Sequence, residues 1–211
     1  MIYNKQIALQ TAGYLLQAKA VKLSPRDLFT WASGIKSPIY CDNRVTLSFH
    51  EIRTFLRDNF CAAIKQHWGN VDLIAGVATG GIAQGALIAQ QLELPFAYVR
   101  TTKKDHGLTN LIEGKVEAGQ RVVVVEDLIS TGKSSLEVVE ALRHAGCEIA
   151  GMVAIFTYNL PVSIEGFKNA NCSLITLTDY DILVEQALAT NYITEDDLTV
   201  LNAFKENLTK K

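Results

Sequence analysis

The sequence predicts an α/β fold in which a central parallel sheet is flanked by helices. Patterns typical of strands and of helices alternate from residue 72 onwards, as they do where right-handed crossovers join parallel strands. The four consecutive valines of Val122–Val125 indicate a fully buried central strand, because helices cover both faces of a parallel sheet. With 211 residues, the chain is long enough for one such domain with a small appendage.

The first quarter of the chain predicts two helices with an irregular segment between them. In the first helix, mainly apolar residues recur at helical spacing, namely Ile7, Ala8, Thr11, Leu15 and Leu16. Residues 25–47 are rich in Ser, Pro and Gly and are expected to be irregular. The second helix is expected from Ser48 to about Trp68, with Ser48 and Glu51 as a capping box.

The rest of the chain is expected to alternate between strands and helices. The expected strands are Asp72–Val77, Phe96–Arg100, Arg121–Glu126, Ile149–Thr157 and Ser173–Leu177. The expected helices are Ile82–Leu92, Ser134–Ala145 and residues near 162–170, 180–189 and 195–207, with a polar loop at 101–120. Ligands of such sheets bind beyond the carboxyl ends of the strands. The loops after Val77, Arg100, Asp127 and Thr157 are therefore expected to share one site.

The segment that follows the valines carries the clearest chemical signal. Glu126 and Asp127 come first, and small residues then lead into a helix. A strand that turns through small residues into a helix N-terminus presents free N–H groups to an anion such as phosphate. The carboxylates suit sugar hydroxyls, or a magnesium ion carried on the phosphates. The alternative is an ordinary strand-to-helix turn whose acids only cap the helix.

Two common nucleotide-binding motifs are excluded by spacing. The G-x-x-x-x-G-K-[ST] pattern would need a glycine where this chain has Asp127, and a carboxylate there would repel a triphosphate. The dinucleotide pattern G-x-G-x-x-G is absent from this segment.

Residues Val122–Ser134 instead resemble the phosphoribosyl diphosphate (PRPP) motif of type I phosphoribosyltransferases. In that family the two carboxylates hold the ribose 2′- and 3′-hydroxyls, and the loop holds the 5-phosphate. The resemblance implies a PRPP site made of Glu126, Asp127, Leu128, Ile129, Ser130, Thr131, Gly132, Lys133 and Ser134. The turn Ala78–Gly81 is expected either to lie against the diphosphate or to let a helix pack closely on a strand.

The loop after residue 100 narrows the resemblance to the orotate phosphoribosyltransferases. Arg100, Lys104 and His106 match their R-x-x-x-K-x-H-G catalytic loop. Some members have a lysine directly after the arginine; this chain has Thr101 there, with Lys103 as a possible substitute. The resemblance implies a lid over the diphosphate. PRPP would be bound by Arg100, Lys103, Lys104 and His106, and the catalytic residues would be Lys104, His106 and Asp127. The alternative is a solvated charged loop.

The segment Phe29–Arg44 resembles the N-terminal hood of the same family, with its F-T-x-x-S-G-x-K-S-P core. The resemblance implies that orotate contacts Ser33 and Gly34, together with Ser130. One branch of the family uses a lysine at Ala32 and an arginine near Tyr158, which this chain lacks. Arg44 is the candidate for the orotate carboxylate, because a guanidinium binds a carboxylate through two bonds. An ion pair with Asp42 is the alternative.

The resemblance covers nearly the whole chain and predicts a single domain, residues 1–211, with a hood built from about 1–47 and the C-terminal region. It implies transfer of phosphoribose from PRPP to orotate in pyrimidine biosynthesis, with Mg²⁺, in a homodimer whose lids are shared. A phosphoribosyltransferase for another base and a PRPP-sensing regulator remain alternatives.

Composition agrees with these expectations. The net charge of −2 gives no electrostatic case for nucleic acid. The four cysteines are scattered, which favours free thiols and a cytoplasmic location. The amphipathic N-terminus predicts neither a signal peptide nor a membrane span.

Overall fold

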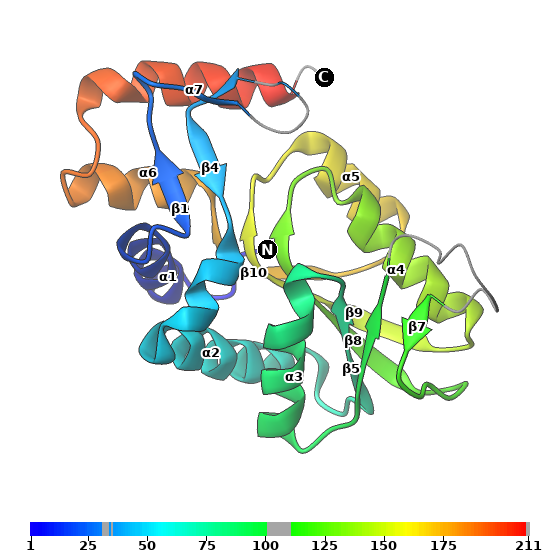
Figure 1. Ribbon diagram of the computed structural model, residues 1–211. Coiled ribbons are helices and arrows are strands. Elements are labelled where there is room, and N and C mark those ends of the chain that lie inside the picture. Colours follow the sequence, from blue (N-terminus) through cyan, green and yellow to red (C-terminus); the bar gives the residue numbers. More distant parts are fainter. Residues whose placement is uncertain (31–33, 35, 101–110, 210–211) are drawn as a thin grey trace.

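The computed structural model describes residues 1–30, 34, 36–100 and 111–209 (Figure 1). Its centre is a six-stranded sheet in the order β10-β9-β8-β5-β6-β7. The strands are β5 (Leu73–Val77), β6 (Phe96–Val99), β7 (Ile112–Glu113), β8 (Arg121–Ile129), β9 (Glu148–Thr157) and β10 (Leu174–Asp179). All neighbours are parallel except β7, which is antiparallel to β6. The predicted α/β fold with a mostly parallel sheet is therefore confirmed.

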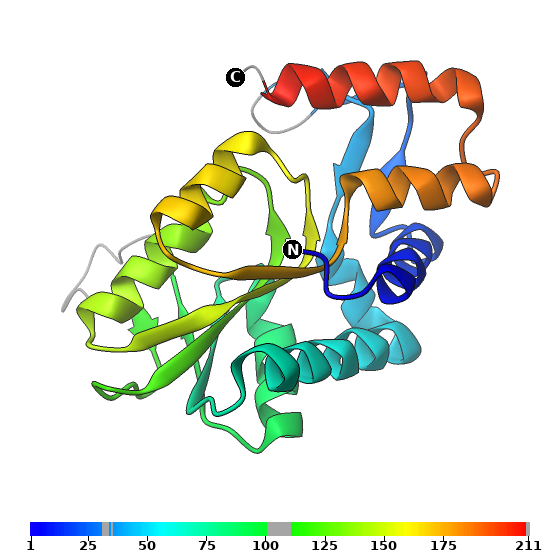
Figure 2. The same cartoon turned by 180° about the vertical axis from the view of Figure 1, so that it is seen from behind.

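Helices cover both faces of the sheet (Figures 1 and 2). One face packs against α2 (His50–Trp68) and α3 (Gly80–Leu92), and the other against α4 (Lys133–His144) and α5 (Pro161–Asn169). The valine run explains this arrangement, because Val123 and Val125 enter one core while Val122 and Val124 enter the other. Side chains alternate between the faces of a strand, so a strand buried on both sides needs apolar residues at every position.

Residues from both ends of the chain form a second body beside the sheet. It contains α1 (Lys5–Gln17), β1 (Val21–Leu23), β2 (Phe29–Thr30), β3 (Lys36–Ser37), β4 (Ile39–Cys41), the 3₁₀ helix η1 (Asn43–Ser48), α6 (Tyr180–Ala189) and α7 (Glu195–Thr209). Strand β1 pairs with β4, and β2 pairs with β3. The N-terminal and C-terminal parts of the chain come into contact where Arg26 Nε lies 3.5 Å from Asp197 Oδ1, and α7 lies beside β1 and β4 in both views (Figures 1 and 2).

The capping box expected at Ser48 and Glu51 is wrong. Ser48 is the last residue of η1, and α2 begins at His50 with Phe49 at its N-cap and no side-chain cap bond. The chain forms η1 instead because Asp42 caps that helix through Arg44 N, and Thr46 Oγ1 donates to the Asn43 carbonyl at 2.6 Å. Residues 25–47, expected to be irregular, also contain the short strands β2, β3 and β4.

Two further boundaries differ from expectation. Strand β8 continues to Ile129, because its pairing with β9 extends to Ile129 opposite Thr157. Asp127 is therefore inside a strand rather than after it. The segment expected as a polar loop contains β7 in its described part, and β7 pairs with β6 through Tyr98 and Glu113.

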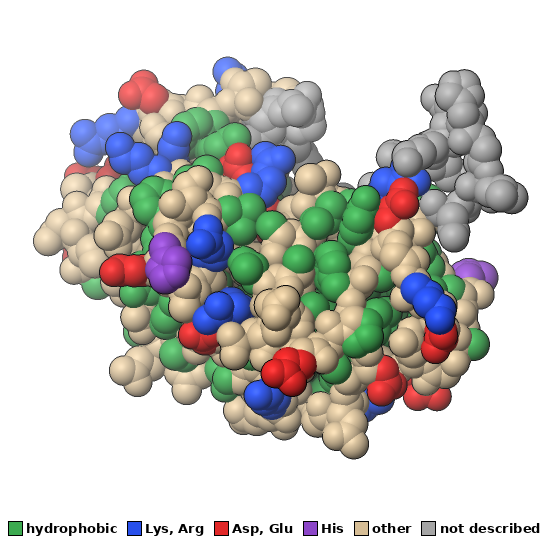
Figure 3. Space-filling view, turned by 60° about the horizontal axis from the view of Figure 1, so that its bottom comes forward, with side chains coloured by type: hydrophobic (Ala, Val, Ile, Leu, Met, Phe, Trp, Pro, Cys, Tyr) green, Lys and Arg blue, Asp and Glu red, His purple; other side chains and the backbone are tan. Residues whose placement is uncertain are grey.

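Charges of both signs are interspersed with hydrophobic side chains on the face that Figure 3 shows. This mixture agrees with the small net charge of −2. No helix in the described ranges is long and apolar enough to cross a membrane.

Candidate functional site

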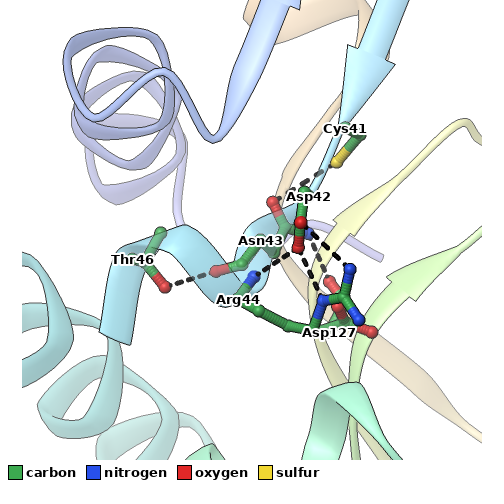
Figure 4. Close-up of polar contacts among 6 residues, drawn as sticks. All are labelled: Cys41, Asp42, Asn43, Arg44, Thr46 and Asp127. Atoms are coloured by element: carbon green, nitrogen blue, oxygen red, sulfur yellow. Dashed lines mark hydrogen bonds and ion pairs between the residues drawn. The ribbon is translucent and has the colours of Figure 1, made fainter. Parts of the chain in front are cut away.

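Asp127 lies where three segments from distant parts of the sequence meet. It is half-buried near the carboxyl end of β8. The N-terminus of α3 lies against its side chain, and η1 contacts its main chain (Figure 4). The structure therefore brings three segments together at Asp127. They are the PRPP-motif strand β8, the two-glycine turn Ala78–Gly81 and the hood segment.

The first turn of α3 packs tightly on β8. A Cβ atom at Gly80 would overlap the carboxyl group of Asp127, and one at Gly81 would overlap the Val125 carbonyl oxygen. Gly81 therefore excludes any residue with a side chain unless the helix moves away, whereas a side chain at position 80 would require the Asp127 side chain to move. Of the two readings of this turn, close packing of a helix on a strand is confirmed, and contact with diphosphate stays a prediction.

Glu126 has a different environment from Asp127. Its residue is only 5% exposed. Asp127 N donates to Glu126 Oε1, and Ser135 Oγ donates to Glu126 Oε2, each at 2.9 Å. Burial first, and the neighbouring Asp127 second, raise the pKa of Glu126 to about 9. Both causes favour the protonated form of the Glu126 carboxyl group.

The loop after β8 and the first residues of α4 expose four polar side chains: Ser130, Thr131, Lys133 and Ser134. Gly132 has a φ of +78°, and it is the N-cap residue of α4 without a side-chain cap bond. Lys133 N donates to Thr131 Oγ1 at 3.5 Å, and the helix dipole favours an anion at the N–H groups of this first turn. Leu128 is half-buried and Ile129 is buried.

The hood segment reaches the end of β8 through its residues 41–44 (Figure 4). Asn43 Nδ2 donates to the Asp127 carbonyl oxygen at 2.7 Å. Arg44 binds Asp42 through two bonds, Nε to Oδ1 at 2.7 Å and Nη2 to Oδ2 at 3.0 Å. This pair lowers the pKa of Asp42 and raises that of Arg44, and Asp127 adds a smaller contribution to the latter. The ion-pair alternative for Arg44 is confirmed, and its contact with orotate stays a prediction.

The structure describes only some of the other predicted site residues. Arg100 follows β6, and its Nη2 lies 3.1 Å from Glu113 Oε1 on β7. Gly34 has a φ of +82°, and no atom lies within 4 Å of a Cβ built there. Ser33, Lys103, Lys104 and His106 lie outside the described residues, so their predicted roles in binding and catalysis stay predictions.

Two polar residues of this region were not predicted from the sequence. Asn43 contacts Asp127, which lies 84 positions away in the sequence. Ser135 is buried, contacts Glu126 and lies one residue beyond the PRPP motif. Of these two residues, only Asn43 could have been indicated by the sequence, because it lies within the predicted hood segment. Among the described residues, no group of three or more His, Cys, Asp or Glu side chains is arranged to hold a metal ion.

Comparison with known proteins extends these observations. Residues 50–168 match the phosphoribosyl transferase domain. The chain is 56% identical over 196 residues to the orotate phosphoribosyltransferase of Phocaeicola vulgatus, covering 93% of this chain and 92% of that protein.

The fold is also shared with solved structures. The orotate phosphoribosyltransferase of Aeropyrum pernix superposes with a TM-score of 0.76 at 27% identity, over 87% of this chain and 99% of that chain. The Mycobacterium tuberculosis enzyme in complex with PRPP has the same fold, with a TM-score of 0.65 at 20% identity, over 84% of this chain and 98% of that chain. The chain therefore belongs to the orotate phosphoribosyltransferases, within the type I phosphoribosyltransferase family.

Proposed function

We propose that this protein transfers the 5-phosphoribosyl group of PRPP to orotate, giving orotidine 5′-monophosphate and diphosphate in the de novo synthesis of UMP. The observation that carries the proposal is the convergence at Asp127. The PRPP-motif loop, the two-glycine turn and the hood segment meet there, as a site that joins a sugar phosphate to a base requires. Relatives that share more than half of their residues with this chain, such as that of Phocaeicola vulgatus, are orotate phosphoribosyltransferases.

In this proposal, PRPP occupies the end of β8 and the loop before α4. The 5-phosphate binds the amides and hydroxyls of residues 128–134, because the first turn of α4 has no side-chain cap. Asp127 carries the negative charge that accepts hydrogen bonds from the ribose hydroxyls. Glu126 lies behind it and contributes to the same sugar site, with Ser135 and the Asp127 amide holding its carboxyl group.

The reaction needs no protein nucleophile. The bond from C1 of the ribose to diphosphate breaks as the orotate ring nitrogen approaches, through an oxocarbenium-like state. The protein acts by holding the reactants in line and by stabilising charge on the departing diphosphate. Lys104 and His106 are proposed to neutralise that charge, with Arg100 and Lys103 nearby in the sequence. Asp127 tempers the positive charge of the ribose ring. A lid that closes over the site would keep water from PRPP.

Magnesium is the expected cofactor, and the residues at the site fit it in part. Carboxylate oxygens are the protein ligands that Mg²⁺ prefers. Asp127 would supply them, and Glu126 would do so on losing its proton. Since the described residues contain no cluster of three potential ligands, most ligands would be oxygens of PRPP and water. When bound, the ion would offset negative charge on the diphosphate.

Orotate is proposed to bind beside the hood segment. Ser33, Gly34 and Ser130 would contact the pyrimidine, and Arg44 would receive its carboxylate. Arg44 is suited to this role because it is positively charged and its side chain is 57% exposed. Asp127 also contributes to raising the pKa of Arg44. Binding would require Arg44 to share or exchange its bonds with Asp42.

At the level of the whole protein, we propose one domain over residues 1–211, with the hood formed by about 1–47 and the C-terminal region. The second body of the structure, in which α6 and α7 pack with β1 and β4, supports this division. The active form is proposed to be a cytoplasmic homodimer in which each lid completes the partner's site.

A panel of bases tests the proposed function. Purified protein is incubated with PRPP, Mg²⁺ and one of orotate, uracil, adenine or hypoxanthine, and diphosphate release is measured. The expected result is release with orotate and no more than background release with the others. Preferred release with a purine would assign the protein to another base. No release with any base, together with intact PRPP binding, would indicate a PRPP sensor.

A further inference from the structure

Asn43 is a buried amide that uses both ends of its side chain. The residue is 1% exposed. Its Oδ1 accepts from Cys41 Sγ at 3.4 Å, and its Nδ2 donates to the Asp127 carbonyl oxygen at 2.7 Å (Figure 4). Its own carbonyl oxygen accepts from Thr46 Oγ1 at 2.6 Å. A buried amide is costly unless it is hydrogen-bonded, so the two side-chain bonds, to Cys41 and Asp127, fix the direction in which Nδ2 points.

The Asp127 carbonyl lies beyond the end of the pairing between β8 and β5. The register of β8 with β5 ends at Val125 opposite Gly76, and β5 itself ends at Val77, three residues before α3 begins. Buried main-chain groups need partners from some other source when the ladder ends. Asn43 Nδ2 supplies one to the Asp127 carbonyl.

The other main-chain group of Asp127 is also held by a side chain. Asp127 N donates to Glu126 Oε1 at 2.9 Å. The peptide groups on the two sides of Asp127 are thus held by Glu126 and Asn43. The direction of the Asp127 carboxylate follows from its main chain, and the Gly80 turn packs against that carboxylate.

We infer that Asn43 is a positioning residue for Asp127, and that it links the base side of the site to the ribose side. This inference rests on the proposed function, in which Asp127 binds ribose. Asn43 lies directly between Asp42 and Arg44 in sequence, so a shift of the hood segment that moves Arg44 also moves the donor to Asp127. Its contribution to turnover passes through Asp127 and not through contact with a substrate.

A double-mutant cycle tests this inference. The value of kcat/KM for PRPP is measured with saturating orotate for the wild type, Asn43→Ala, Asp127→Asn and the double variant. Removal of the Asn43 amide is expected to lower kcat/KM about five- to tenfold in the wild-type background. In the Asp127→Asn background it is expected to lower kcat/KM less than twofold, because the group that it positions is already impaired.

Thr46→Val is the matched control. It removes a buried hydrogen bond from the same 3₁₀ helix, keeps the side-chain shape and does not touch Asp127. Thr46→Val is expected to lower the melting temperature as Asn43→Ala does, while kcat/KM stays within about threefold of wild type. If Asn43→Ala itself folds poorly, Asn43→Asp provides the second variant, since it keeps the shape and the Oδ1 acceptor but loses the donor.

The outcomes distinguish a failure of the positioning role of Asn43 from a failure of the proposed function. An equal loss from Asn43→Ala in both backgrounds would overturn the positioning role, as would a loss in Thr46→Val as large as in Asn43→Ala. Both results leave the proposed function intact, because the wild type still releases diphosphate with orotate. A wild-type protein without orotate-dependent turnover would overturn the proposed function and this inference together.

Discussion

Glu126 and Asp127 are neighbours in the sequence, but their surroundings give their carboxyl groups different properties. Glu126 is 5% exposed, contacts Ser135 on α4 and has a pKa raised to about 9. Asp127 is half-buried and lies against the Gly80 turn. In the proposed mechanism, Asp127 therefore faces the ribose, and Glu126 holds the Asp127 amide.

Replacement of Asp127 by Asn is expected to lower turnover far more than stability. The change keeps the shape of the side chain but removes its charge. Loss of a charge-assisted hydrogen bond costs about 1.5–3 kcal/mol of transition-state binding, or about ten- to a hundredfold in kcat/KM. Steady-state kinetics with PRPP and orotate, alongside a thermal melt, check this. A folded variant with kcat/KM near that of the wild type would remove Asp127 from the chemistry.

Glu126 should make stability depend on pH. Its folded pKa of about 9 lies above the ordinary value of 4.5, so between these values the folded state binds more protons than the unfolded state. The stabilising effect is therefore complete below pH 4.5 and is lost as the pH rises towards 9. Glu126→Gln keeps the shape without titrating, and its stability relative to wild type should increase with pH.

Urea denaturation at several values between pH 5.5 and 8.5 measures this difference. Glu137→Gln, on the exposed face of α4, is the control and should follow the wild-type profile. A constant difference between Glu126→Gln and wild type across this range would show that the Glu126 proton is not held on folding.

At the residue scale, local motifs were predictable and long-range contacts were not. Residues 126–134 could be proposed as a PRPP site because strand, acids and small residues follow one another in sequence, and this assignment stays a prediction. The bond between Asn43 and Asp127 joins residues 84 positions apart, and no local pattern indicates it. The partner of Arg44 was open for the same reason, since Asp42 and a substrate carboxylate satisfy a guanidinium equally well.

Among the elements, α3 depends most on its glycines, because its first turn packs directly on β8. Gly81→Ala would place a methyl group on the Val125 carbonyl and force the helix away from the sheet. The expected cost is about 1–3 kcal/mol or more, a fall of several degrees in melting temperature. Activity should also fall, because the displaced turn leaves Asp127.

Gly13→Ala is the matched control for this substitution. Gly13 lies inside α1, and the nearest atom to its added Cβ is the end of the Gln186 side chain at 3.6 Å. Alanine is the better helix former by about 1 kcal/mol, so this change should be neutral or stabilising. Similar melting temperatures for the two variants would contradict the packing described for α3.

The elements were predictable where their pattern is repeated over many residues. The valine run gave β8 and its two buried faces, and helical spacing gave α1 and α3. The predicted boundaries failed where tertiary contacts decide them. Strand β8 extends to Ile129 because β9 is there to pair with it. The capping box failed because Ser48 belongs to η1, whose own bonds end before α2 begins.

In the whole molecule, the order of the strands explains the position of the site. The chain builds outward from β5 through β6 to β7, and then from β8 through β9 to β10 in the other direction. Strands β5 and β8 are neighbours at the point of reversal, and ligands of open α/β sheets bind at this point. Asp127 and the Gly80 turn lie there. The sequence predicted five strands of this sheet but not β7. It did not predict the strand order, because spacing along the chain does not show which strands are neighbours.

Subunit exchange tests the proposed shared site. An Asp127→Asn protein is mixed with a Lys104→Ala protein, each of low activity on its own. If each lid serves the partner's site, every mixed dimer contains one site with both defects and one site with neither. About half of the dimers are mixed at random exchange, so about a quarter of wild-type activity should return. No recovery after verified exchange would show that each lid serves its own site.

The central claim is that PRPP binds at the end of β8, between Asp127 and the first turn of α4. A crystal structure with PRPP, Mg²⁺ and orotate tests it most directly. The account predicts the ribose hydroxyls within hydrogen-bond distance of Asp127, the 5-phosphate on the amides of residues 128–134, and Asn43 Nδ2 still bonded to the Asp127 carbonyl. A PRPP molecule bound elsewhere, for example in the cleft between α5 and the N-terminus near Asn159 and Asp179, would contradict it.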